Sequence, residues 1–116
     1  MPFILFILAT LLGAAATVSA LGKFKKKADV MAIMEHVGVS ADMIPVLGLL
    51  EVAGALGLFA GIWNKPLGVA SAVGLALYFA GAIVAHLRKK DSFKDLGPAA
   101  GLTVLSVLVV LLESVR

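Results

Sequence analysis

Glu51 is the residue of this sequence with the clearest capacity for chemistry, because it is the only charge in a long apolar run. The run covers residues 43–62 and reads MIPVLGLLEVAGALGLFAGI. A helix of that length rises by ~1.5 Å per residue and spans ~30 Å, the thickness of the hydrocarbon core of a bilayer. A carboxyl group at that depth destabilises the protein unless it is paired, hydrated or protonated. Glu51 is therefore predicted either to carry a proton or bind a ligand, or to hold helices together through hydrogen bonds.

Two other polar side chains are expected near Glu51. Glu51 and Tyr78 are the same number of residues from the turn that follows residues 43–62, so they are expected at the same depth in the membrane. Counting from the ends of the apolar runs on the other side of the membrane places Ser106 close to that depth. Tyr78 is the expected partner, because a phenol can donate a hydrogen bond to a carboxylate. His86, at the end of the third apolar run, is either a proton relay to Glu51 or a simple interfacial residue.

Several classes of protein are excluded by what the sequence lacks. It has no cysteine, so disulfides, iron–sulfur clusters and thiol redox relays are excluded. His36 lies in a polar connection and leaves no intramembrane histidine pair for a haem, and no residues have metal-ligand spacing. No phosphate-binding loop or Ser-His-Asp arrangement is present, so no catalytic residue and no metal site is predicted. The basic residues stand beside apolar runs, which indicates membrane orientation and no nucleic-acid partner.

The composition predicts an integral membrane protein. The chain has 116 residues, 61% of them hydrophobic, and its mean hydropathy is +1.08. An ordinary soluble domain is about half apolar. The expected fold is all-α, a single domain over 1–116 that forms an antiparallel four-helix transmembrane bundle. Its four expected spans cover residues 3–21, 43–62, 67–85 and 99–115.

The first run could be a secretory signal peptide, but no basic residue precedes it, so a retained helix is expected. Residues 28–37 have apolar side chains at helical spacing, which predicts a short amphipathic interfacial helix between the first and second spans, or else a solvated basic loop. The two longer connections carry most of the basic residues. The positive-inside rule therefore predicts a multi-pass protein of the cell (inner) membrane with lysine-rich connections in the cytoplasm and both termini outside.

Small residues recur along the second and third spans. Membrane helices associate by close packing through such residues. The helix-packing positions predicted on this basis are Gly48, Gly54, Gly57, Gly61, Gly74 and Gly81.

The sequence resembles the DoxX-like family of small four-helix membrane proteins. The resemblance covers nearly the whole chain and rests on Gly22-Lys23, on LGLLEVAGALGLFAGIW at residues 47–63, on GVASAVGLALYFAGAIVAHLRKKD at residues 68–91, and on Pro98. The lysine, glutamate and histidine that recur in the family match Lys23, Glu51 and His86. The resemblance implies a four-helix bundle. Some members look like subunits of quinone-linked membrane oxidoreductases, others are linked to oxidative-stress complexes, and distant relatives act as membrane chaperones.

Three functional hypotheses follow. The first is an accessory subunit of a membrane oxidoreductase or oxidative-stress complex, which binds a quinone or a lipid near Glu51 and receives electrons from a membrane or cytoplasmic redox partner. The second is a chaperone, assembly or lipid-binding module without catalytic activity, which forms a homo-oligomer or binds another protein. The third is a proton-coupled carrier, for which a dimer would supply the inverted repeat. A polar-lined cavity that reaches Glu51 would favour the first hypothesis, and a closed core the second.

Overall fold

A computed structural model describes residues 3–90 and 93–116, apart from the side chains of residues 93–96. In this part of the chain every regular element is a helix. The five helices are α1 (Phe3–Phe24), α2 (Ala28–His36), α3 (Ile44–Ala60), α4 (Lys65–Arg88) and α5 (Phe93–Val115). The all-helical prediction is therefore confirmed.

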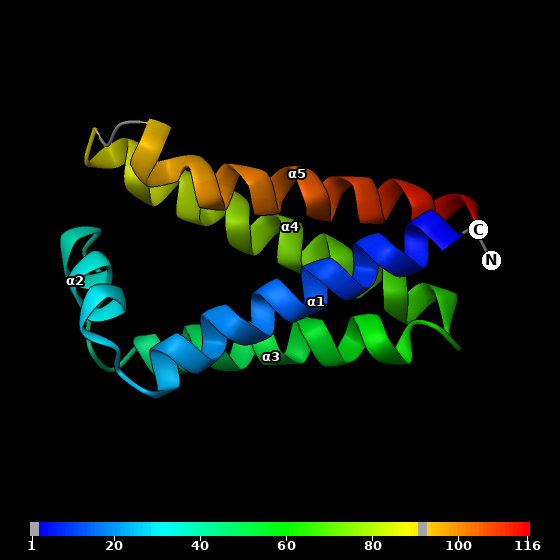
Figure 1. The fold of residues 1–116 in the computed structure, drawn as a ribbon, viewed down its shortest axis with the longest axis horizontal. Helices are drawn as coiled ribbons and strands as arrows, with labels where there is room; N and C mark the ends of the chain where they lie inside the picture. The colour runs from blue at the N-terminus through cyan, green and yellow to red at the C-terminus, as the bar shows by residue number, and fades with distance from the viewer. Residues whose placement is uncertain (1–2, 91–92) are drawn as a thin grey trace.

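Four of the helices lie along the long axis of the molecule, and each reverses the direction of the one before it (Figure 1). The short helix α2 lies across one end, and both chain termini lie at the other. The Cα atoms extend over 41 × 26 × 18 Å. A bilayer with its head groups is about 40–45 Å thick, close to the longest of these dimensions.

Three helical segments are long and apolar enough to cross a membrane, namely Phe3–Phe24, Lys65–Arg88 and Gly97–Val115. Helix α3 is apolar but has only 17 residues. Large apolar side chains remain exposed along the bundle, among them Leu56 and Leu77, which are 64% and 70% exposed. An outer surface of this kind is stable against lipid and unfavourable in water. The chain is therefore a membrane protein.

The core lies where the four long helices meet. Its buried members are mainly aliphatic residues with one aromatic ring, and they come from all four helices: Leu5, Leu12, Ala16, Leu58, Ala72, Leu75, Phe79 and Val109. Helix α1 packs mainly on α3, and α4 packs mainly on α5, so the bundle consists of two closely packed pairs.

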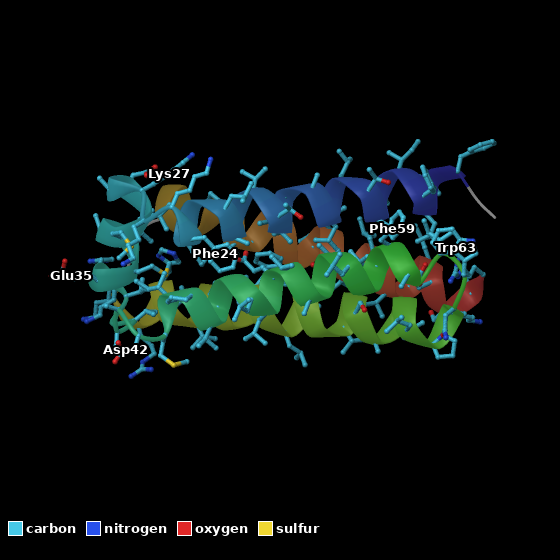
Figure 2. All side chains as sticks on the ribbon, turned by 90° about the horizontal axis from the view of Figure 1, so that it is seen from below. Phe24, Lys27, Glu35, Asp42, Phe59 and Trp63 are labelled. Atoms are coloured by element: carbon cyan, nitrogen blue, oxygen red, sulfur yellow. The ribbon has the colours of Figure 1, made fainter. Side chains whose placement is uncertain are left out.

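Glycines of α3 allow its neighbours to approach closely. A Cβ at Gly48 would lie 2.8 Å from the Phe24 ring, which lies between α1 and α3 (Figure 2), and a Cβ at Gly54 would lie 2.6 Å from Leu75. Gly57 contacts Ser71 of α4 in the same manner. At the α3–α4 turn, a Cβ at Gly61 would overlap the backbone of Gly68, which sequence reasoning did not single out.

The two glycines proposed as packing residues on α4 have different surroundings. A Cβ at either Gly74 or Gly81 would have nothing within 4 Å among the described residues. Both positions face outward from the bundle, so in a single copy of this chain they do not hold helices together.

The structure also differs from expectation at several helix ends. Helix α4 begins at Lys65, where the Asn64 side chain accepts a hydrogen bond of 3.1 Å from the Leu67 amide. Helix α5 begins earlier than residue 99, so Pro98 lies inside the helix and not in its first turn. Trp63, in the turn that joins α3 and α4, is 75% exposed and stacks edge-on against Phe59.

Candidate polar site at the Glu51–Lys23 ion pair

Glu51 and Lys23 form an ion pair inside the bundle. The Lys23 Nζ lies 2.8 Å from Glu51 Oε1, and the two side chains are 6% and 0% exposed. The pair joins α1 to α3. Lys23 is thus the ion-pair partner of Glu51, while Tyr78, to which counting along the sequence points, is a second neighbour. A fully buried carboxylate needs a positive charge or hydrogen-bond donors nearby, and Lys23 supplies both.

Helix geometry explains how a lysine in the last turn of α1 reaches into the bundle. Side chains on a helix tilt toward its N-terminus, so Lys23 extends back along α1 and away from the lysine-rich segment that follows it. Its ammonium group also donates a hydrogen bond of 2.8 Å to Ser19 Oγ, one turn earlier. With two of its three protons assigned to acceptors, the ammonium group is held between α1 and α3.

Tyr78 of α4 is the second neighbour of Glu51. Its hydroxyl lies close enough to the Glu51 carboxylate for the two groups to interact electrostatically. The other carboxylate oxygen, Oε2, is buried and has no hydrogen-bond partner among the described residues. A buried carboxylate oxygen without a donor is uncommon in proteins and marks a position where an O–H or N–H group from a ligand would be stabilised.

A groove lies between α3 and α4, and Tyr78 is part of its lining. Its volume is about 530 Å³, within the range of small-molecule sites, and it is largely open to the outside of the bundle. Tyr78 and Ser71 provide its hydroxyl groups, and the remaining lining is aliphatic or glycine: Leu50, Ala53, Gly54, Ala70, Gly74, Leu75 and Leu77. Glu51 is fully buried and does not line the groove, so Tyr78 is the residue that connects the two. The groove therefore has an apolar body and a phenol beside a buried acid, which suits an amphiphile with a small polar head.

The other predicted site residues lie further from this pair. Ser106 is fully buried and donates its hydroxyl at 2.7 Å to the Leu102 carbonyl in its own helix, so its proton is not directed to Glu51. A hydroxyl in an apolar helix commonly bonds in this way, because the carbonyl four residues earlier is the nearest acceptor. His86 is half-buried in the last turn of α4. The structure thus brings together Lys23, Glu51 and Tyr78.

Glu113 of α5 is a second buried acid, although its place at the far end of the last apolar run, residues 99–115, predicts that it is solvated at the membrane boundary. It is 4% exposed, and its carboxylate contacts Gly68 of α4. Arg116 lies beside it, with Nε 3.6 Å from Glu113 Oε1, and its guanidinium also donates to the Gly61 and Ile62 carbonyls in the α3–α4 turn. The expectation was wrong because Gly68 has no side chain and leaves space for the carboxylate. The sequence feature that could have indicated the burial of Glu113 is a small residue, Gly68, opposite the last turn of α5.

Comparison with known proteins gives a family for most of the chain. The sequence model of the DoxX-like family matches residues 7–109. The uncharacterized protein YdgD of Bacillus subtilis (strain 168) is 35% identical over 69 residues, which are 59% of this chain and 60% of that protein. The chain thus covers less than two thirds of that relative. No solved structure matches significantly.

Proposed function

We propose that this chain, which belongs to the DoxX-like family, binds a quinone or a lipid in the groove between α3 and α4, with the polar head of the ligand at Glu51 and Tyr78. The observation that carries the proposal is the unpartnered Glu51 Oε2 near Tyr78, whose side chain lines an apolar groove. A ligand hydroxyl would donate to Oε2, and a ligand carbonyl would accept from the Tyr78 hydroxyl.

Within this proposal, the role of the protein is that of an accessory subunit. The sequence has no cysteine, and the described residues contain no group of His, Asp and Glu that could hold a metal ion. A bound quinone would therefore exchange electrons with a membrane or cytoplasmic redox partner. The protein would orient the head group and supply a charged acceptor close to it.

Two glycines of α4 allow a matched test of the groove. Gly74 lines the groove, whereas Gly81 does not. A Cβ added at either position would have no described neighbour within 4 Å. Gly74→Leu should fill part of the groove and expel the ligand, whereas Gly81→Leu adds the same side chain outside it. Native mass spectrometry of protein extracted gently from its own membrane measures the retained small molecule, and Tyr78→Phe tests the hydroxyl alone.

The expected result is a quinone or lipid retained by the wild type and Gly81→Leu and lost from Gly74→Leu. Equal retention by both leucine variants would contradict the groove as the binding site. Retention of a partner protein or a second copy, without any small molecule, would favour the alternative function. In that alternative the chain is a chaperone or assembly module, and its exposed Gly81 face packs on the partner or the second copy. A proton-coupled carrier would instead require proton uptake that depends on Glu51.

We also propose that α1, α3, α4 and α5 all span the membrane as an antiparallel bundle, with α2 in the interfacial region. The clustering of both lysine-rich connections at the α2 end, opposite the termini, supports this arrangement (Figure 1). Lys27, Glu35 and Asp42 lie at that end, and Trp63 lies at the other, where an aromatic ring is favoured at the membrane boundary (Figure 2). The positive-inside rule then places the α2 end in the cytoplasm.

A further inference from the structure

A second cavity lies at the α2 end of the molecule, and Lys23 is part of its lining. It encloses about 360 Å³ between the end of α1, helix α2 and the start of α3. Its lining combines charged and apolar side chains: Lys23, Lys26, Met31, Ala41, Asp42, Ile44 and Pro45. We call it the α2 pocket.

The backbone at Lys26 has an unusual conformation for a lysine. Helix α1 ends with two hydrogen bonds, from the Lys27 amide to the Gly22 carbonyl and from the Lys26 amide to the Lys23 carbonyl. This pattern is a Schellman motif, in which the residue in the position of Lys26 is left-handed and is usually glycine. Lys26 has a φ of 53° there. The lysine therefore adopts a strained conformation here, and its side chain lines the α2 pocket.

The charges around the α2 pocket are mainly positive. Of its charged lining residues, Lys23 is already neutralised by Glu51, and Lys26 and Asp42 have opposite charges. Lys25 and Lys27 stand directly beside Lys26 and are exposed. Three lysines without an assigned partner, Lys25, Lys26 and Lys27, thus remain at the end of this helix, and basic residues beside a membrane-spanning helix attract anionic lipid head groups.

We propose that the α2 pocket binds the phosphate group of an anionic phospholipid. Lys26 would contact the phosphate, Lys25 and Lys27 would add to the positive potential, and Met31 and Ile44 would contact the glycerol and upper acyl carbons. A lipid is the favoured source of the phosphate, because the pocket lies where a membrane-spanning helix ends and part of its lining is apolar. The proposal depends on the membrane placement of the bundle and not on a ligand in the α3–α4 groove.

The chain provides a matched control at Lys90. This lysine follows the end of α4, at the same end of the molecule, and also has a left-handed backbone, with a φ of 57°. Lys90 does not line the α2 pocket. Lys26→Gly and Lys90→Gly therefore remove the same charge and relieve the same backbone strain, but only the first changes the pocket. Neither substitution should unfold the protein, and thermal unfolding in detergent checks this.

The test is native mass spectrometry of the detergent-purified protein titrated with phosphatidylglycerol or with phosphatidylcholine. We expect the wild type and Lys90→Gly to prefer phosphatidylglycerol and Lys26→Gly to bind it about fivefold more weakly. Asp42→Asn should bind it more tightly, because a negative charge leaves the pocket. Equal weakening by both glycine variants would overturn the proposal, since it would indicate diffuse attraction to all the lysines, and so would equal binding of the two lipids.

Inorganic phosphate separates a lipid from a soluble ligand. If millimolar phosphate displaces phosphatidylglycerol completely from the wild type, the pocket recognises the free anion, and the lipid assignment is overturned. If the lipid stays bound, its glycerol and acyl groups contribute to recognition as proposed. The groove experiment with Gly74→Leu has a different variant and a different ligand, so either proposal can fail alone.

Discussion

Replacing Lys23 by Met should destabilise the protein by about 3–5 kcal/mol, because it leaves Glu51 as a buried charge without its partner. The lysine and glutamate side chains are 6% and 0% exposed, so solvent screening does not reduce this value. Methionine retains the apolar volume of the lysine stem, which limits the effect of lost packing. Glu51→Gln should also destabilise the protein, since it leaves the buried Lys23 ammonium without its counter-charge.

The double variant Lys23→Met/Glu51→Gln is the decisive comparison. It removes both charges together, so its loss of stability should be smaller than the sum of the two single losses by about 2 kcal/mol or more. Equilibrium unfolding in mixed detergent micelles would give these free energies. Lys27→Met is the control, because this exposed lysine at the same helix end should change the free energy by less than about 0.5 kcal/mol. Additive single losses, or equal effects of Lys23→Met and Lys27→Met, would refute the ion pair as a stabilising contact.

Three further predictions concern glycine positions, backbone strain and orientation. Gly61→Ala should destabilise the protein by about 1–3 kcal/mol in the same unfolding assay, because its Cβ would overlap the Gly68 backbone. Gly81→Ala should be neutral or stabilise the protein by up to about 1 kcal/mol, because its Cβ would meet no described neighbour. A larger loss of stability for Gly81→Ala than for Gly61→Ala would contradict the α3–α4 packing. Lys26→Gly should raise the free energy of unfolding by about 1 kcal/mol because glycine adopts a positive φ without strain, and a lower stability would be incompatible with this reason. Because the natural sequence has no cysteine, a single cysteine at Lys26 should react with an impermeant maleimide only after cells are opened, and one at Asn64 in intact cells; the opposite pattern would invert the orientation.

The all-helical fold and the membrane environment were predictable from the sequence, because apolar runs of this length are typical of membrane-spanning helices. That Glu51 is buried in the bundle also followed, since a carboxyl in the middle of such a run must avoid lipid. Counting residues pointed to Tyr78, which does lie near Glu51, but it did not reveal Lys23 as the ion-pair partner. Equal counting assumes that each side chain stays level with its own Cα, but Lys23 extends by about one turn toward the N-terminus of α1 and meets Glu51 there.

The helix contacts were less predictable than the helices. Gly74 and Gly81 have the same spacing as true packing glycines, but the described neighbours leave them uncovered, because the rotation of a helix about its own axis is set by all its contacts together. The burial of Glu113 depends on Gly68, a residue distant in the sequence. A carboxylate near a helix end is normally solvated, and only the three-dimensional arrangement reveals the space that accepts it.

Lys23 connects the two proposed sites, because its ammonium binds Glu51 and its side chain also lines the α2 pocket. A phosphate in that pocket would attract the Lys23 ammonium and weaken its bond to Glu51. A carboxylate with a weaker partner accepts hydrogen bonds more strongly, so a ligand hydroxyl at Oε2 would then bind more tightly. Thermodynamic linkage requires the reverse effect to be equal, so the groove ligand would strengthen phosphate binding by the same factor. The direction of this coupling follows from a single shared cation and needs no change in the fold.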